Sequence, residues 1–348
     1  MRNTWGCLTA LMCSLVLTAF PFYLEAKASE VDEMFEELLC DSSIVHTRQI
    51  KIPGYHNAYN PSLIPYKDGY LLSFRYISRC PETVEGKFRT DVSFIGLVRL
   101  DKKFKVFEKT VQFLNIVSHS SNFSLTAEDA RLLTMGDRVF VFFNDLPLMS
   151  SSGGFAMYFG ELVEQQGMFV LKEPAKPLNY LHASPIEKNW SPFVSGDRLY
   201  LIYSDQPRVI LELDLNTGYC QEVARTDVNW NWNLGQIRGG TPACLVNETF
   251  LTFFHSSFPA KTTKKRAYVM GAYTFDMDPP FTVRTMTFRP LGNLEYYTED
   301  NPPKVIFPGG MVVQDHSIHV AWGKADKKIF ITTFNRDKLL ASMQPCSE

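Results

Sequence analysis

A repeated pattern of apolar and polar positions runs along the chain from residue 57 to residue 326. Its unit is a tight polar motif, a short turn, and a mostly apolar run of five residues that ends in an aromatic residue. Short apolar runs bounded by turn signals indicate buried β-strands. The five runs are Tyr70–Phe74, Val139–Phe143, Leu199–Tyr203, Phe250–Phe254 and Ile318–Trp322.

The polar motif of each repeat contains a proline, or Ala130 in the second repeat. The motifs are Asn60-Pro61, Asp129-Ala130, Ser191-Pro192, Thr241-Pro242 and Phe307-Pro308. In every repeat this proline or alanine precedes the aromatic end of the run by 11 to 14 residues. Hairpin turn signals lie between motif and run in four repeats: Lys67-Asp68-Gly69, Met135-Gly136-Asp137, Ser195-Gly196-Asp197 and Val246-Asn247-Glu248.

The spacing of the repeats predicts the architecture. Successive repeats begin 50 to 69 residues apart, which is enough for four short strands with their turns, the content of one propeller blade. The sequence therefore predicts an all-β fold, a five-bladed β-propeller with its active site at one mouth of the central channel. A β-sandwich with coincidental strand spacing is the alternative.

The N-terminal segment predicts export. Arg2 is followed by an apolar run from Trp5 to Tyr23 and then by the small-residue pattern Ala26-Lys27-Ala28, an order typical of a cleaved secretory signal. We therefore expect a signal peptide over 1–28, a single propeller domain over 29–348, and a periplasmic, extracellular or secretory-lumen location. An uncleaved membrane anchor is the alternative, because the run approaches the length of a spanning helix.

The composition and net charge limit the classes of binding partner and cofactor. The net charge is −2 and the sequence pI is about 6.4, so neither nucleic acid nor an anionic membrane is expected. No Cys/His spacing resembles a zinc site, and we expect no metal or other cofactor. Five cysteines follow the signal, namely Cys40, Cys80, Cys220, Cys244 and Cys346. Cys40 and Cys346 stand near the two ends, which meet in a closed ring, and are the predicted disulfide pair.

Polar residues beside the motifs are expected to meet in space, because the first strand of each blade lines the channel and the loops of one mouth converge on its axis. These residues include both carboxylates and cations, a combination suited to a proton donor beside an anion pocket. They are Asn57, Asn60, Glu128, Asp129, Arg131, Glu187, Lys188, Asn189, Arg238, Thr241, His255, Lys324 and Asp326.

Five short segments carry a more specific signal: Glu128–Arg131, Glu187–Trp190, Gly239–Pro242 with His255, Asp276–Pro280, and Val305–Gly310 with Trp322–Asp326. In this order they resemble the Glu-Asp-Pro-Arg, Lys-Asn, Gly-Gly-Thr-Pro, Asp-x-x-Asp-Pro and final Phe-Pro-x-Gly segments of glycoside hydrolase family 130. That family contains β-mannoside phosphorylases and hydrolases. The related glycosyltransferase family 108, β-mannosyltransferases, is similar as well.

The resemblance implies an inverting reaction at a β-mannosidic bond, and it implies roles for individual residues. Asp129 falls on the family's general acid. Arg131, Lys188 and His255 fall on the cationic residues that hold phosphate or another anion, with Arg238 close by. Asp326 falls on a late aspartate that contacts sugar hydroxyls, and we add Asn60, Glu128 and Asn189 as sugar-binding candidates.

Three functions stay open at this point. The first is a β-mannoside phosphorylase or β-mannosyltransferase with a phosphate-bearing mannose donor, whose partners are an oligosaccharide, a sugar phosphate or inorganic phosphate. The second is an inverting hydrolase, which needs a further carboxylate to activate water, and Glu128 or Glu187 is available. The third is a non-catalytic carbohydrate-binding propeller, against which the pairing of Asp129 with two cations argues.

At several of these positions a purely structural role is the alternative to a functional one. Asp129 is also a plausible turn aspartate, Arg131 and Lys188 are plausible surface charges, and His255 is a plausible core histidine. The sequence departs from the family pattern at Ala130, Arg238 and Ser256. The added charge of Arg238 suits a sugar phosphate or nucleotide sugar, and its glycine neighbours indicate close approach to either a ligand or a neighbouring strand.

Overall fold

The computed structural model describes residues 41–79, 92–117, 124, 126–146, 154–259, 266–293, 296 and 305–346. The predicted signal peptide, Cys40 and Cys80 lie outside these residues. Cys220, Cys244 and Cys346 are free cysteines in the described chain, and the pairing of Cys40 with Cys346 stays a prediction. The described residues contain no helix that is long and apolar enough to cross a membrane.

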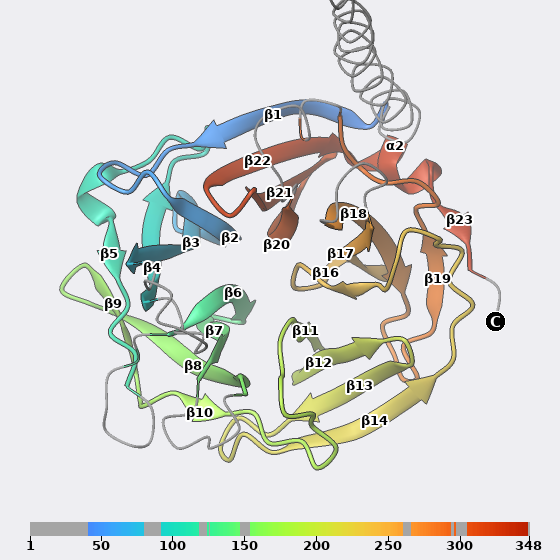
Figure 1. Cartoon of the computed structure of the whole chain (residues 1–348), viewed down its shortest axis with the longest axis horizontal. Coiled ribbons are helices and arrows are strands. Elements are labelled where there is room, and N and C mark those ends of the chain that lie inside the picture. Colours follow the sequence, from blue (N-terminus) through green and yellow to red (C-terminus); the bar gives the residue numbers. More distant parts are fainter. Residues whose placement is uncertain are drawn as a thin grey trace, which may run out of the picture.

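Five antiparallel sheets stand around a central axis, each with its first strand innermost (Figure 1). The predicted five-bladed β-propeller is thereby confirmed. Blade 1 contains β2 (Ala58–Tyr66), β3 (Gly69–Arg79), β4 (Val92–Leu100) and β5 (Gln112–Phe113). Blade 2 contains β6 (Glu128–Met135), β7 (Arg138–Asp145), β8 (Ala156–Gln165), β9 (Met168–Leu171) and β10 (Lys176–Pro177).

The remaining blades follow the same plan. Blade 3 contains β11 (Ser191–Ser195), β12 (Arg198–Asp205), β13 (Arg208–Leu213) and β14 (Cys220–Thr226). Blade 4 has a divided inner strand, β15 (Arg238–Gly239) and β16 (Cys244–Val246), followed by β17 (Thr249–Pro259), β18 (Arg266–Phe275) and β19 (Val283–Met286). Blade 5 contains β20 (Ile306–Gln314), β21 (Ser317–Lys324) and β22 (Lys328–Asn335).

The ring is closed by strands from both ends of the chain. β1 (Ile44–Ile50) pairs antiparallel with β22 and forms the outer strand of blade 5, with Ile50 opposite Ile329. After the short helix α2 (Arg336–Ala341), β23 (Gln344–Pro345) pairs with β19 at the outer edge of blade 4. Each terminal strand thus covers a sheet edge that would otherwise be open to other chains.

The core lies between neighbouring blades. Phe193 of blade 3, for example, packs against Phe250 and Phe275 of blade 4, with ring centroids 5.1 and 5.2 Å away. Near the axis the inner strands of blades 5 and 1 approach closely at Gly309, where a Cβ would lie 2.2 Å from the carbonyl oxygen of Pro61. This packing fixes the start of each inner strand, and therefore the polar residues there.

Candidate active site

The inner strands of blades 1 and 2 begin with the same irregularity. Asn60 and Asp129 have positive φ values of 45° and 54°, and the strand register shifts at both positions. Short polar side chains tolerate this left-handed backbone, but it is strained and such residues cluster at functional sites. The two side chains meet, and Asn60 Nδ2 donates a hydrogen bond of 2.8 Å to Asp129 Oδ1.

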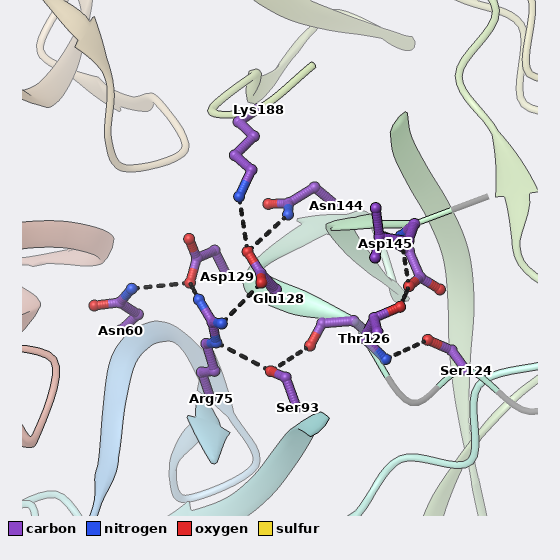
Figure 2. A network of polar contacts seen from close by, with 12 residues as sticks. Asn60, Arg75, Ser93, Ser124, Thr126, Glu128, Asp129, Asn144, Asp145 and Lys188 are labelled. Atoms are coloured by element: carbon purple, nitrogen blue, oxygen red, sulfur yellow. Dashed lines mark hydrogen bonds and ion pairs between the residues drawn. The ribbon is translucent and has the colours of Figure 1, made fainter. Parts of the chain in front are cut away.

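Arg75, on β3 of blade 1, lies between the two carboxylates of blade 2 (Figure 2). Its Nη2 is 2.8 Å from Glu128 Oε1 and its Nη1 is 3.6 Å from Asp129 Oδ1. Its Nε donates to Ser93 Oγ at 3.0 Å, and the guanidinium lies over the ring of Tyr59 at 5.3 Å. Arg75 is buried, so its orientation is fixed on several sides.

The second carboxylate oxygen of Glu128 binds two further donors. Lys188 Nζ, from the loop before blade 3, lies 2.9 Å from Oε2, and Asn144 Nδ2 donates to the same oxygen at 3.2 Å. Lys188 also lies over the ring of Phe155 at 3.6 Å. Glu128 therefore connects blades 1, 2 and 3, and both of its oxygens are occupied by protein groups.

Asp129 is held in its ionised form. Its burial works against the charge, but the nearby Arg75, the hydrogen bond from Asn60, and the charges of Lys188 and Arg131 together lower the pKa of its carboxyl below the usual value. A carboxylate of this kind is a proton acceptor in the resting protein, and it becomes a proton donor only after taking a proton.

Arg131 is fully buried and binds the backbone of blade 4. Its Nε donates to the Gly240 carbonyl oxygen at 2.6 Å and its Nη2 to that of Gly239 at 3.2 Å. Its guanidinium lies 5.4 Å from the ring centre of Phe307. Burial lowers its pKa to about 10, so it stays cationic at neutral pH. Arg131 is thus not a surface charge, and its Nη1 has no hydrogen-bond partner among the described residues.

His255 and Arg238 face each other across β17 and β15. His255 is buried, and burial followed by the charges of Arg131 and Arg238 lowers its pKa to about 3. It is therefore neutral at physiological pH and can contribute a hydrogen bond but no charge to an anion pocket. Arg238 is exposed. A Cβ on the next residue, Gly239, would lie 2.1 Å from the Asn189 carbonyl oxygen, so this glycine permits close approach to a neighbouring strand rather than to a ligand.

Asp326 reaches the same mouth from the tip of the β21–β22 hairpin, where Ala325 and Asp326 have φ values of 54° and 53°. The residue is exposed. Loss of solvation around its carboxyl raises the pKa to about 6, and the negative charges of Asp129 and Glu128 act in the same direction. Two carboxyls of one mouth thus have pKa values shifted in opposite directions, a pattern that often accompanies acid–base chemistry.

Glu187 and Asn189 serve the loop that carries Lys188. Glu187 accepts hydrogen bonds from Trp190 Nε1 at 2.8 Å and from Tyr203 Oη at 3.0 Å, and also from the backbone N–H of Ser184. Its carboxylate therefore anchors the loop. Asn189, with φ 67°, accepts a long hydrogen bond of 3.4 Å from Arg131.

The structure brings together most of the predicted site residues and adds two that the sequence reasoning missed, Arg75 and Asn144. The sequence contains a positional signal for both residues. Each stands directly after the aromatic residue that ends the apolar run of its repeat, the position that His255 occupies in the fourth repeat. Because the second strand of each blade ends at the mouth, the residue after that aromatic reaches the site. The roles predicted for the individual residues stay predictions.

The family profile described as beta-1,4-mannooligosaccharide phosphorylase matches residues 197–345. Beta-mannosyltransferase 3 of Candida albicans is 44% identical over 57 residues, which are 16% of this chain and 10% of that protein. The C-terminal part of this chain is therefore related to glycoside hydrolase family 130. The resemblance seen in the motifs is confirmed, and the matched segment spans about a tenth of the length of this curated relative.

Solved structures of two phosphorylases and a mannosyltransferase share the fold. β-1,2-Mannobiose phosphorylase from Listeria innocua is similar at a TM-score of 0.57 and 17% identity, over 86% of this chain and 94% of that one. MPT-4, a mannose phosphorylase from Leishmania mexicana, is similar at 0.58 and 11% identity, over 93% and 97%. MPT-1, a GDP-Man-dependent mannosyltransferase from the same organism, is similar at 0.58 and 12% identity, over 87% and 92%. At these identities the similarity establishes the fold alone.

Proposed function

We propose that this protein is a carbohydrate-active enzyme that transfers mannose, with inversion, between a phosphate-bearing donor and an acceptor hydroxyl. The relationship to phosphorylases and to a β-mannosyltransferase supports mannose as the sugar and phosphate as the leaving or attacking group. Asp129 is the proton-transferring residue in this proposal.

One observation carries the proposal: the ionised state of Asp129, held by Asn60 and Arg75 at the inner end of blade 2. In the direction of transfer the acceptor hydroxyl attacks the anomeric carbon and its proton passes to Asp129. The bond between the anomeric carbon and the phosphate oxygen breaks, and its electron pair leaves with the phosphate. By microscopic reversibility the protonated Asp129 is the acid of phosphorolysis, and the ionised Asp129 of the resting protein is the form that begins transfer.

The way in which the carboxylates of the site are bound also favours phosphate chemistry over hydrolysis. A phosphate nucleophile or leaving group needs cations, whereas hydrolysis by inversion needs a second carboxylate to activate water. Glu128 and Glu187 were the candidates for that task, and both have their oxygens bound by protein donors. Asp326 is the remaining carboxyl at the mouth, and its raised pKa keeps inverting hydrolysis as the second candidate.

The test incubates the protein from Ser29 onward with mannose 1-phosphate or a nucleoside diphosphate mannose and a set of acceptor sugars. Donor-dependent product that requires an acceptor supports transfer, and hydrolysis of β-mannosides without phosphate supports the second candidate. Asp129→Asn is expected to lower kcat by about 10²–10⁴-fold. The exposed Asp197→Asn is the matched control. No activity with any donor or mannoside would refute the proposal and favour a carbohydrate-binding propeller.

We also propose that the chain is exported after cleavage of residues 1–28 and that the mature residues form one propeller domain. The Arg2, apolar run and Ala26-Lys27-Ala28 pattern supports this proposal. Mass spectrometry of the protein recovered from a secreting host tests it, with Ser29 expected at the N-terminus. An intact Met1 on membrane-bound protein would support the anchor instead.

A further inference from the structure

A polar cavity of about 320 Å³ lies between blades 2 and 3, which are neighbours in the ring (Figure 1). Its wall on blade 2 comes from β7, β8 and residues 172–176, and its wall on blade 3 comes from residues 215 and 216, in the turn after β13. The eight residues of β6 run from Glu128 at the mouth to Met135 and span about 25 Å. Arg138, which lines the cavity, follows the turn after β6. The cavity therefore lies toward the end of the propeller opposite the mouth, and its lining residues are not those of the candidate active site.

Glu161, on β8, is the less exposed of the two carboxylates that line the cavity, the other being Glu173. It accepts a hydrogen bond from Arg138 Nη2 at 2.8 Å, and Lys172 Nζ lies 3.3 Å from the same oxygen. The hydrogen bonds from Arg138 and Lys172 lower the pKa of Glu161 below its usual value, so this carboxylate is ionised at neutral pH. Glu161 is thus an acceptor that two cationic side chains hold in place.

A third cation, Lys176, joins the two walls of the cavity. Its Nζ donates to the Leu215 carbonyl oxygen of blade 3 at 3.4 Å and lies 3.1 Å from Glu173 Oε2. The side chains of Arg138 and Lys172 are about half exposed, at 46% and 54%. Because exposed ion pairs contribute only about 0–1 kcal/mol to stability, these groups can exchange a protein partner for a ligand at little cost.

The apolar part of the lining is formed by Phe140 and Phe159, which are buried, and by the half-buried Leu215. The guanidinium of Arg138 lies 4.7 Å from the centre of the Phe140 ring. Charged groups and apolar surface thus meet in one cavity, which suits a ligand that has both polar groups and an apolar face.

The balance of donors and acceptors narrows the class of ligand. A phosphate or another strong anion needs donors alone, and the two carboxylates of the lining repel it. A hydroxyl group both donates and accepts hydrogen bonds, so it can donate to Glu161 and accept from Arg138 or Lys172. An uncharged sugar has several hydroxyl groups and an apolar ring face. The volume is at the lower end of the range of about 300–1,000 Å³ for small-molecule sites, which fits a short saccharide.

We propose that this cavity is a second saccharide-binding site, which binds an uncharged mannoside away from the mouth. The saccharide class follows from the groups that line the cavity, whereas the choice of mannose rests on the proposed function. Binding at this site retains the protein on a mannoside chain and leaves the mouth free for a further sugar.

The experiment measures the binding of a β-linked mannobiose to the full mature chain by titration calorimetry. We expect two sites in the wild-type protein. Glu161→Gln is expected to weaken one of them by about 10–100-fold, the range for a hydrogen bond to a charged group, and to leave kcat and KM for mannosyl transfer unchanged. Glu212→Gln is the matched control, because Glu212 is paired with the exposed Arg198 in blade 3 and does not line the cavity.

A second variant, Leu215→Trp, fills the cavity and leaves its charged groups in place, so it should abolish the same site. Circular dichroism verifies that both variants are folded. Mannobiose binding that is insensitive to both substitutions, or no mannobiose binding at all, refutes this inference and leaves the proposed function to the activity assay. Binding of inorganic phosphate in place of mannobiose, lost in Leu215→Trp, refutes it in favour of an anion site. A Glu161-dependent site in a protein without any transferase or hydrolase activity supports the inference and refutes the proposed function.

Discussion

Replacing Arg75 by methionine should move the pH dependence of activity, because Arg75 helps to keep Asp129 ionised. The guanidinium lies 3.6 Å from Asp129 Oδ1. Coulomb's law at an effective dielectric constant between about 20 and 80 gives about 1–5 kcal/mol at this distance. This corresponds to about 1–3 pKa units, the usual effect of an adjacent opposite charge. Without Arg75 the neighbouring Glu128 keeps Lys188 as its cationic partner but loses the guanidinium that lies between it and Asp129, so its negative charge acts more strongly on Asp129 and raises the pKa of Asp129 further.

The sign of the effect follows from the role of Asp129. In the transfer direction the ionised carboxylate is active, so activity is lost as the pH falls through the pKa of Asp129. We expect this acidic limb to move to higher pH by about 1–3 units in Arg75→Met. Arg75→Lys, which keeps the charge, should show a smaller displacement.

The assay is the initial rate of mannosyl transfer as a function of pH at saturating donor and acceptor. Arg208→Met is the control, because Arg208 is also a buried, ion-paired arginine but binds Asp205 and Tyr273 away from this network. Circular dichroism verifies that each variant is folded. An acidic limb that stays in place in folded, active Arg75→Met would show that Arg75 does not control the ionisation of Asp129.

Three further predictions concern stability and the mouth. Arg208→Met should lower the free energy of unfolding, measured by urea unfolding, by about 3–5 kcal/mol, because the buried Asp205 loses its cationic partner and keeps the hydrogen bond from Tyr273 Oη. A loss below about 1 kcal/mol would contradict this. Gly323→Ala should lower both the melting temperature and the activity, since the added Cβ would lie 2.4 Å from Asn60 Oδ1. An unchanged kcat and an unchanged melting temperature would contradict this close packing. Asp326→Asn should raise the melting temperature more at pH 7 than at pH 4, because a carboxyl with a raised pKa loses its stabilising proton as the pH rises toward 6. Equal effects at both pH values would contradict the raised pKa of Asp326.

The sequence predicted the fold because its signal is local and repeated five times. An apolar run such as Val139–Phe143 specifies a buried strand wherever it lies, and the nearby Met135-Gly136-Asp137 specifies the preceding turn. Gly136 has the positive φ that such a turn requires. Asp129 could likewise be named from its motif, since the start of an inner strand always faces the channel.

The sequence could not predict the roles of individual charged residues that have the same chemistry. Glu187 has the same chemistry as Glu128, yet it binds Trp190 and anchors a loop, whereas Glu128 joins three blades. Arg131 was a candidate for the anion pocket, and the structure shows its Nε and Nη2 bound to carbonyl oxygens while Nη1 has no partner among the described residues. The difference depends on which backbone groups lie within about 3 Å, and spacing along the chain does not encode that distance.

The sequence by itself determined the strands, their repetition and the identity of the residues at the start of each blade, because hydrophobic periodicity and turn chemistry act over a few residues. Only the tertiary structure decided the ionisation of Asp129. Its pKa depends on Asn60 and Arg75, which are 69 and 54 positions away in the chain. The packing of blade 1 against blade 2 brings these groups within hydrogen-bonding or ion-pairing distance in a buried site, where charges interact more strongly than in water.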